Sequence, residues 1–176
     1  FLADPFVIKK NGAHFCFVED LDYRTNKGII SAYKITSSSC DSLGVVLEED
    51  FHLSFPFIFE YQNDLFMCPE TSEKGEIRVY KCTEFPAKWE FHKTLMKDVS
   101  AADSIIFKRD KVWWLFTNID KSGVGDHNCQ LHIFSADNPL SDEWVAHENN
   151  PVIFDPLVAR NGGLIISDNE IYRVFQ

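Results

Sequence analysis

Four segments of the chain share one pattern, in which two short apolar runs flank a two-residue polar turn. The first is 4–19, and its centre, Asn11-Gly12, is a strong signal for a β-hairpin because both residues tolerate positive φ. The pattern recurs at 55–70, 103–118 and 161–176, centred on 62–63, 110–111 and 168–169. We therefore expect four antiparallel hairpins with two-residue turns, and the two ends of each hairpin should lie side by side.

The paired ends of these hairpins are mostly polar, although the strands between them are apolar. The expected end pairs are Asp4 with Glu19, Phe55 with Glu70, Asp103 with Asn118, and Asn161 with Gln176. Because these residues occupy one position in successive repeats, we expect them to converge on a shared polar mouth. Concave places with a few convergent polar groups are where ligands usually bind.

Each hairpin is followed by further strand-like segments. The hairpins begin 51, 48 and 58 residues apart, and repetition at that period with β patterning is typical of four-stranded propeller blades. Third strands are expected at 28–34, 76–81 and 130–135, and outer strands at 44–47, 89–92 and 144–147. The inner strands are apolar on both faces, as in blades packed between neighbours. The chain holds three blades and the inner hairpin of a fourth, so we expect further blades outside it or an open ring.

Composition narrows the classes of partner. The 176 residues carry a formal net charge of −10 without any basic cluster, which argues against nucleic acid or an anionic membrane. No run approaches 18 apolar residues, so we expect no membrane insertion. The five cysteines include no Cys-x-x-Cys pair, and we expect a reduced, cytoplasmic protein. The length fits one propeller domain over 1–176, and the chain reads as a fragment because it opens in a strand without Met.

Several motifs resemble those of known propellers. The Ala3-Asp4-Pro5-Phe6 opening, the repeated hairpins and the Ser135 to Trp144 segment resemble the five-bladed β-propellers of glycoside hydrolase families 43, 62, 32 and 68. The chain is more similar to the propeller domain of glucosamine inositolphosphorylceramide transferases, and of bacterial proteins that join it to formyltransferase-like domains. That similarity lies in 51–56, 67–71, 113–116, 147–152 and 159–160. It implies an all-β, five-bladed, glycosidase-like propeller, present here as an incomplete set of blades.

The resemblance to the hydrolases also implies roles at the mouth. It implies a base or nucleophile at the Asp-Pro of the first blade and a substrate-orienting Asp on the third, and Asp4 and Asp103 match these positions. The general acid should be a Glu on the fourth blade, but Arg160-Asn161-Gly162 stands there. A glycosidase needs a proton donor as well as a carboxylate at the anomeric carbon. The hydrolase assignment is therefore incomplete.

The candidate residues at the mouth each have a functional and a structural interpretation. Asp4 and Asp103 are catalytic or sugar-binding candidates, or they cap loops and accept backbone N–H groups. Glu19 and Glu70 can supply the missing acid, bind sugar hydroxyls or pair with Arg160. Arg160 can bind a carboxylate or phosphate, or simply neutralise its acidic neighbours.

Other candidates have less specific patterns. His52 is a possible ligand contact or a satisfied structural histidine, and Asn118 is a possible hydrogen-bond donor to a sugar. Trp113 and Trp114 alternate faces, and core packing is the expected role of both. No metal-ligand pattern occurs, so we expect neither a metal nor a cofactor.

Three functions remain open on the sequence alone, and with them whether the chain is an enzyme. The favoured one is a carbohydrate-recognising propeller that acts on a carbohydrate or glycoconjugate beside a transferase domain, without efficient hydrolysis. The first alternative is a glycoside hydrolase with Asp4 as base or nucleophile and a displaced general acid. The second is a protein-interaction propeller. Arg160 favours carbohydrate recognition over hydrolysis, because a guanidinium does not give up a proton at ordinary pH.

Overall fold

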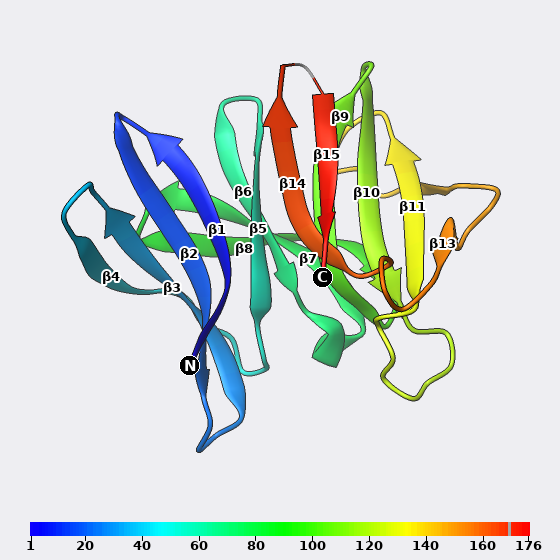
Figure 1. Cartoon of the computed structure of the whole chain (residues 1–176), viewed down its shortest axis with the longest axis horizontal. Coiled ribbons are helices and arrows are strands. Elements are labelled where there is room, and N and C mark those ends of the chain that lie inside the picture. Colours follow the sequence, from blue (N-terminus) through cyan, green and yellow to red (C-terminus); the bar gives the residue numbers. More distant parts are fainter. Residues whose placement is uncertain (169) are drawn as a thin grey trace.

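The strands of this chain form separate antiparallel sheets, as seen in a computed structural model that describes residues 1–168 and 170–176 (Figure 1). Phe, Val, Ile and Tyr recur in the strands, and such side chains suit a pleated, half-buried surface. Within the described ranges there is no α-helix, only a short 3₁₀ turn at Ser72–Lys74. The predicted all-β class is confirmed.

Three sheets have the predicted four-stranded meander. The first contains β1 (Leu2–Lys10), β2 (Ala13–Asp22), β3 (Lys27–Ile35) and β4 (Cys40–Leu47) in that order. The second contains β5 (Ser54–Tyr61), β6 (Asp64–Glu70), β7 (Glu76–Glu84) and β8 (Lys88–Lys97). The third contains β9 (Ala101–Arg109), β10 (Val112–Ile119), β11 (Gln130–Ala136) and β12 (Val145–Ala146), and β13 (Ile153–Phe154) also pairs with β11. The fourth sheet is the hairpin of β14 (Asn161–Ser167) and β15 (Glu170–Phe175).

The two-residue turns are confirmed in the first three hairpins. Asn11-Gly12, Gln62-Asn63 and Asp110-Lys111 all have positive φ at both turn residues. Positive φ at both positions characterises type I′ turns, whose twist matches that of the flanking strands. The fourth turn, expected at 168–169, includes Asn169, which lies outside the described residues.

The pairing at the polar ends differs by one residue from the prediction. Glu19, Glu70, Asn118 and Asn161 pair with Ala3, Ser54, Ala102 and Phe175, not with Asp4, Phe55, Asp103 and Gln176. The cause is a register irregularity near the polar end of each hairpin, where the inner strand carries an extra residue. At three of these bulges Asp4, Phe55 and Asp103 have φ of 47°, 46° and 50°. Bulges re-aim neighbouring side chains, so the expected ends share one end of the fold but do not lie opposite one another.

Aromatic side chains fill the two interfaces between complete blades. Phe17 of the first blade lies 5.6 Å from Trp89 of the second, measured between ring centroids. Trp113 of the third blade lies 5.6 Å from Tyr61 of the second and is 7% exposed. Both faces of the second blade are therefore buried, as predicted. Trp113 is a core residue, whereas Trp114 is only half-buried and lines a hollow on the other face of its sheet.

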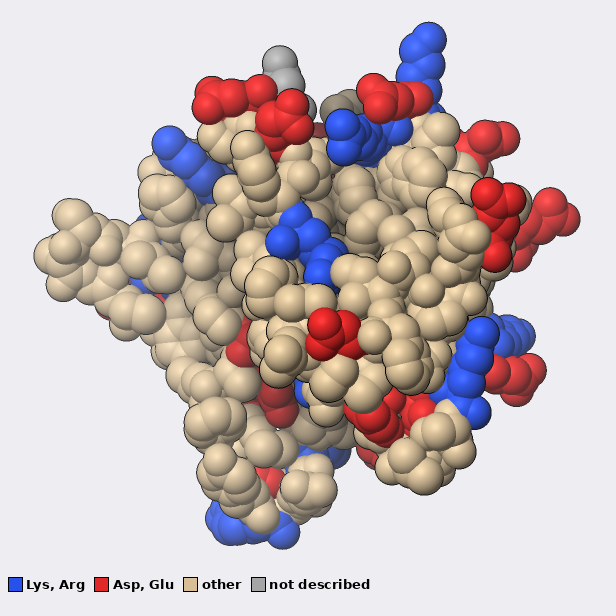
Figure 2. All heavy atoms as spheres, turned by 45° about the vertical axis from the view of Figure 1, so that its right-hand side comes forward, with Lys and Arg blue, Asp and Glu red and all other residues tan. Residues whose placement is uncertain are grey.

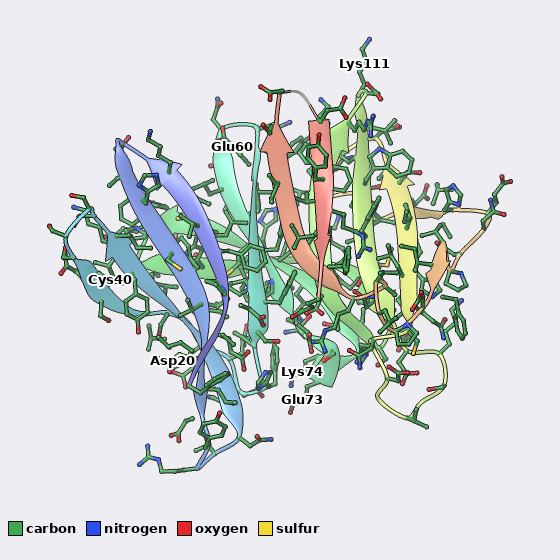
Figure 3. The ribbon with its side chains drawn as sticks, viewed as in Figure 1. Asp20, Cys40, Glu60, Glu73, Lys74 and Lys111 are labelled. Carbon is green, nitrogen blue, oxygen red and sulfur yellow. The ribbon has the colours of Figure 1, made fainter. Side chains whose placement is uncertain are left out.

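The hairpin turns and the polar ends lie at opposite ends of the molecule. Figure 3 labels Glu60 and Lys111 near the turns at the top, and Asp20, Glu73 and Lys74 toward the bottom. The long loops that follow β2 and β10 also leave at the bottom (Figure 1). The inner strands β1, β5, β9 and β14 contact one another in sequence around the centre. Their polar ends are thereby brought together.

The surface of the molecule is mixed in charge. On the face drawn in Figure 2, Lys and Arg lie among Asp and Glu rather than in one continuous basic area. Among residues 1–168 and 170–176, no helix is long and apolar enough to cross a membrane.

Candidate functional site

Six titratable residues gather at the polar end of the inner strands, and we call them the central cluster. Their members come from all four sheets or the segments just before them: Asp4, Glu19, His52, Glu70, Asp103 and Arg160. The charges of Asp4, His52, Glu70, Asp103 and Arg160 each act on the pKa of at least one other member, and the pKa of Glu19 responds to three of them. Such mutual effects need short separations. The structure therefore brings together these six residues that the sequence singled out.

Asp103 and Arg160 form the ion pair of the cluster. Arg160 Nε donates to Asp103 Oδ2 at 2.5 Å, and Asp103 is only 1% exposed. Burial raises the pKa of Asp103 to about 7 although Arg160 acts in the opposite direction, and Glu70 and Asp4 raise it further. Burial alone lowers the pKa of Arg160, but the charge and hydrogen bond of Asp103 raise it overall. Arg160 is thus a fixed cation beside a carboxylate whose charge depends on pH.

Asp4 and Glu19 are acids whose ionised forms are disfavoured. Burial raises the pKa of half-buried Asp4, against a hydrogen bond from the Phe55 backbone and the charges of Arg160 and His52. Burial also raises the pKa of Glu19, which is 8% exposed. His52 lowers the pKa of Glu19, while Asp4 and Glu70 raise it. Carboxylates held close together resist ionising together.

His52 is held in one orientation by a glycine of the neighbouring strand. The backbone N–H of Gly28 donates to His52 Nδ1 at 2.9 Å, so in the neutral ring the proton sits on Nε2. That nitrogen lies 3.4 Å from Glu19 Oε1. A Cβ on Gly28 would lie 2.4 Å from the carbonyl oxygen of Leu53 and 2.8 Å from His52 Cε1. Only glycine fits between these groups.

Asn118 does not act as the ligand contact that its position suggested. It is fully buried, and Nδ2 donates to the carbonyl oxygens of Gln130 at 3.1 Å and Ala159 at 2.9 Å. Its Oδ1 accepts the backbone N–H of Asn161 at 2.9 Å. Both amide hydrogens are taken by backbone groups, so Asn118 has no donor left for a sugar.

Gln176, expected at the polar mouth, does reach the cluster, with Nε2 3.5 Å from Asp103 Oδ2. Two residues near the cluster escaped the sequence reasoning. Asn128, from the long loop after β10, accepts from Arg160 Nη1 at 3.1 Å, and Gly28 is the second. A glycine inside a strand signals close approach of another group, and that signal could have identified Gly28. Nothing in the loop sequence singles out Asn128.

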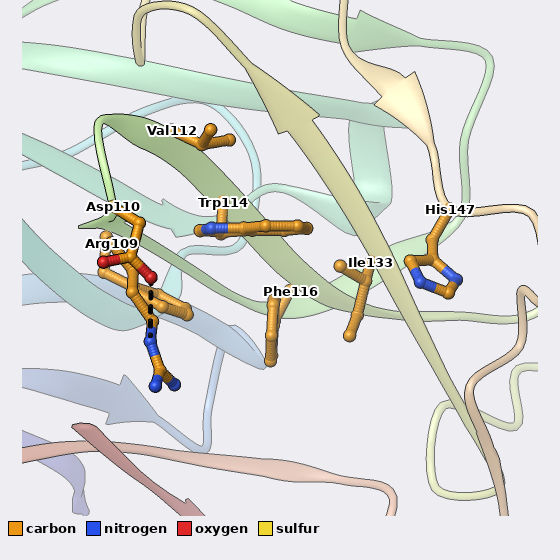
Figure 4. Close-up of a pocket in the computed structure, with 8 residues that line it drawn as sticks. Arg109, Asp110, Val112, Trp114, Phe116, Ile133 and His147 are labelled. Atoms are coloured by element: carbon orange, nitrogen blue, oxygen red, sulfur yellow. Dashed lines mark ion pairs between the residues drawn. The ribbon is translucent and has the colours of Figure 1, made fainter. Parts of the chain in front are cut away.

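Two apolar hollows lie away from the central cluster. One, of about 390 Å³, is lined by Trp114, Phe116, Ile133 and His147 beside the Arg109–Asp110 ion pair (Figure 4). The other, of about 410 Å³, lies between the inner strands and is lined by residues such as Phe57 and Ile106. Neither is lined by a member of the cluster, whereas a third pocket, of about 370 Å³, is lined by His52 together with Phe51 and Glu73. We place the candidate site at the cluster because charged donors and acceptors from successive blades converge there.

The central cluster can bind polar ligands in a defined orientation. Ionised Asp4 and Glu70 accept hydrogen bonds, Arg160 donates them, and bonds to charged groups are the stronger kind.

Among the residues that the structure describes, no group of three or more His, Cys, Asp or Glu side chains is arranged to hold a metal ion.

Solved structures with a similar fold are glycoside hydrolases. An exo-β-1,3-galactanase from Phanerochaete chrysosporium, solved with β-1,3-galactotriose, matches with a TM-score of 0.73 and 10% identity over 98% of this chain and 41% of that chain. An α-L-arabinanase from Cellvibrio cellulosa, solved with arabinohexaose, matches with a TM-score of 0.70 and 14% identity over 98% of this chain and 67% of that one. These likenesses show that the fold is a glycosidase-like β-propeller.

Sequence comparison identifies the family. Glucosamine inositolphosphorylceramide transferase 1 of Oryza sativa subsp. japonica is 36% identical over 179 residues, covering 98% of this chain and 24% of that protein. The Arabidopsis thaliana protein of the same name is 35% identical over 182 residues, covering 100% and 23%. The chain thus spans about a quarter of the length of these relatives. The family model described as glucosamine inositolphosphorylceramide transferase 1, N-terminal, matches residues 1–176. The chain therefore belongs to this family of N-terminal domains.

Proposed function

We propose that this chain is a carbohydrate-recognising propeller domain, which acts on a glycoconjugate beside a transferase domain and does not hydrolyse glycosides efficiently. The observation that carries the proposal is the environment of Arg160. Its guanidinium lies on Asp103 at 2.5 Å, at the repeat position where the resemblance to glycosidases would require a general acid. A guanidinium at this position orients ligand oxygens without giving them a proton.

The absence of a proton donor should lower the rate of glycoside hydrolysis by a large factor. General acid–base assistance is typically worth about 10²–10⁴-fold in rate. Without it, Asp4, Glu70 and Arg160 still form a set of acceptors and donors for sugar hydroxyls. Such contacts bind the ground state and the transition state about equally, and uniform binding does not accelerate a chemical step.

The setting of the domain is part of the same proposal. A companion transferase domain is supported by the name of the relatives and by the small share of their length that this chain spans. A ring of five blades is supported by the resemblance of the hairpins to the five-bladed hydrolases. The link to formyltransferase-like domains and the cytoplasmic location remain predictions from the sequence.

A specific observation keeps the hydrolase alternative in view. A general acid needs a raised pKa, and burial raises the pKa of Glu19 and, to about 7, that of Asp103. Glu19 also contacts His52, whose Nε2 can exchange a proton with it. In this alternative Asp4 is the base or nucleophile, and Glu19 is the displaced acid.

The experiment compares the full-length protein with Asp4→Asn, Glu19→Gln and Glu70→Gln variants. Binding is measured on a glycan array that includes arabinohexaose and β-1,3-galactotriose, and turnover is measured on aryl glycosides. We expect glycan binding that weakens about 10–100-fold in Asp4→Asn and Glu70→Gln, since a bond to a charged group is worth about 1.5–3 kcal/mol. No variant should show turnover.

Two results would lead to other functions. Turnover by the wild-type protein that disappears in folded Asp4→Asn or Glu19→Gln would identify a hydrolase. A folded wild-type protein that binds no glycan on the array would favour the protein-interaction alternative.

A further inference from the structure

We propose that Asn118 and Arg173 are positioning residues, which hold the backbone of residues 158–161 so that the Arg160 guanidinium stays on Asp103. The inference deepens the proposed function, because it concerns the one cation of the same site. Its test uses no carbohydrate. Failure of the positioning role and failure of carbohydrate recognition are therefore distinguishable.

The segment that carries Arg160 has little regular structure of its own. Residues 155–160 lie between the short β13 and the start of β14, outside any strand. Backbone groups at such a place are not paired by a strand ladder, and buried ones need other partners. Ala159 is nevertheless fully buried. Backbone N–H groups supply some partners, including the Gln176 N–H, which donates to the Arg160 carbonyl at 3.1 Å. Side chains from two neighbouring strands supply those of the Val158 and Ala159 carbonyl oxygens.

Asn118 holds the segment from the third blade. Its Nδ2 donates to the Ala159 carbonyl oxygen at 2.9 Å, and its Oδ1 accepts the Asn161 N–H at 2.9 Å. These two bonds bracket Arg160, one residue before it and one after. The position of the Arg160 backbone is thereby tied to β10, the neighbour of the strand that carries Asp103.

Arg173 holds the same segment from β15. Its Nη1 lies 3.1 Å from the Ala159 carbonyl oxygen, 3.4 Å from that of Arg160 and 3.2 Å from Asn161 Oδ1, and its Nη2 donates to the Val158 carbonyl oxygen. In the part of the chain that the structure describes, no carboxylate forms an ion pair with Arg173. A half-buried guanidinium whose hydrogen bonds go to neutral oxygens loses hydration without gaining a countercharge. Holding this segment accounts for that arrangement.

Asn161 completes the connection to Asp103. Its Nδ2 donates to the Asp103 backbone carbonyl at 2.8 Å and to the Phe116 carbonyl at 3.2 Å, and the residue is fully buried. The backbones of Asp103 and Arg160 are therefore held relative to each other by bonds that do not involve the Asp103–Arg160 ion pair. The Arg160 side chain is then held by two bonds of its own. Its Nε donates to Asp103 Oδ2 at 2.5 Å, and its Nη1 donates to Asn128 Oδ1 at 3.1 Å.

The test is spectroscopic and uses the full-length protein with ¹⁵N in its arginine side chains. The Arg160 Nε–H resonance, assigned with Arg160→Lys, reports the bond to Asp103. The test variants are Asn118→Leu and Arg173→Lys. The matched control is Tyr80→Phe, which replaces a fully buried residue of β7 and removes its bond to Glu49 Oε1 at 2.9 Å, away from Asp103 and Arg160.

We expect both test variants to move the Arg160 Nε–H resonance and to speed its exchange with water at least about tenfold, the factor that corresponds to 1.4 kcal/mol. The titration midpoint of the Asp103 carboxyl should rise at the same time, because Arg160 lowers the pKa of Asp103. Tyr80→Phe should change neither the Arg160 resonance nor the Asp103 midpoint. Unchanged signals in a folded test variant would overturn the proposal, and so would an equal change in Tyr80→Phe. Arg173→Lys alone decides the matter if Asn118→Leu does not fold.

Discussion

At the scale of single residues, the central cluster combines one fixed cation with several acids whose ionisation is disfavoured. Asp103 is 1% exposed and yet touches Arg160, so burial and the ion pair act on its charge in opposite directions. Burying a charge is costly unless it is paired, and removing one partner of a buried pair leaves the other exposed to that cost. The protonation of Asp103 therefore connects the site to the stability of the fold.

Asp103 should make the protein less stable as pH rises toward neutrality. Its pKa is raised from 3.8 to about 7 on folding, so between these values the folded state holds a proton that the unfolded state has released. The contribution is fully present below pH 3.8 and is lost as pH rises through about 7, with a slope of at most about 1.4 kcal/mol per pH unit.

Asp103→Asn, which does not titrate, checks this sign. We expect the free energy of unfolding of the variant, relative to wild type, to improve steadily from pH 4 to pH 7.5. Urea denaturation in steps of pH gives the comparison. A relative stability that is flat, or that falls over this range, would show that Arg160 keeps Asp103 ionised throughout.

Gly28→Ala should disturb both the fold and the His52–Glu19 contact. The new Cβ would meet the Leu53 carbonyl at 2.4 Å and Glu19 Oε1 at 3.1 Å, and forced overpacking typically costs about 1–3 kcal/mol. The comparison variant is Gly12→Ala, where nothing lies within 4 Å and only the positive φ of 77° is unfavourable. Both are measured by thermal unfolding and by the ¹⁵N signals of His52. A His52 signal that moves equally in the two variants would contradict the assigned contact.

Sequence reasoning found the charged members of the cluster but not their supports. Asp4, Glu70 and Asp103 were found because repeats place them equivalently along the chain. Gly28 and Asn128 act across blades, and a single strand pattern carries no information about its neighbour's side chains. Asn118 was found for its polarity, but polarity alone does not separate a ligand donor from a buried amide that binds backbone.

At the scale of elements, the period of apolar residues predicted the strands, while the bulges needed coordinates. Turn chemistry fixed the hairpin centres, and Asn11-Gly12 is the clearest example. The extra residue near the polar end is marked less uniformly. Pro5, Pro56 and Gly162 lie at three of the four irregularities, and Pro or Gly within a strand often marks a bulge, but the irregularity at Asp103 has neither. The one-residue offset of Glu19 and Glu70 from their expected partners follows from these irregularities.

Trp113→Ala should test the packing between the second and third blades. Trp113 is 7% exposed and packs against Tyr61 and Phe59 of the preceding blade. Truncating a buried aromatic typically costs about 3–5 kcal/mol, so Trp113→Ala should lower the unfolding free energy by that amount. Phe154→Ala, at a residue 73% exposed, is the control and should change it by less than about 0.5 kcal/mol. Equal losses in denaturant unfolding would contradict the packing of blades two and three through Trp113.

At the scale of the whole molecule, the arrangement of blades explains why residues about 50 positions apart become neighbours. The inner strands lie side by side around the centre, so each repeat delivers its polar end to the same place. The fold class and this meeting point followed from the repeat. The two apolar hollows did not, because they depend on how side chains of different blades fill the space between them.

The central claim is that this polar end binds carbohydrate without cleaving it, and one titration tests it most directly. The glycan that the array identifies as the strongest ligand is titrated into the full-length protein and into Asp4→Asn, and the glycan is then recovered and analysed. We predict saturable binding by wild type, binding weaker by about 10–100-fold in the variant, and intact glycan from both. Cleaved glycan recovered from wild type but not from Asp4→Asn would contradict the claim, and so would equal binding by the two proteins.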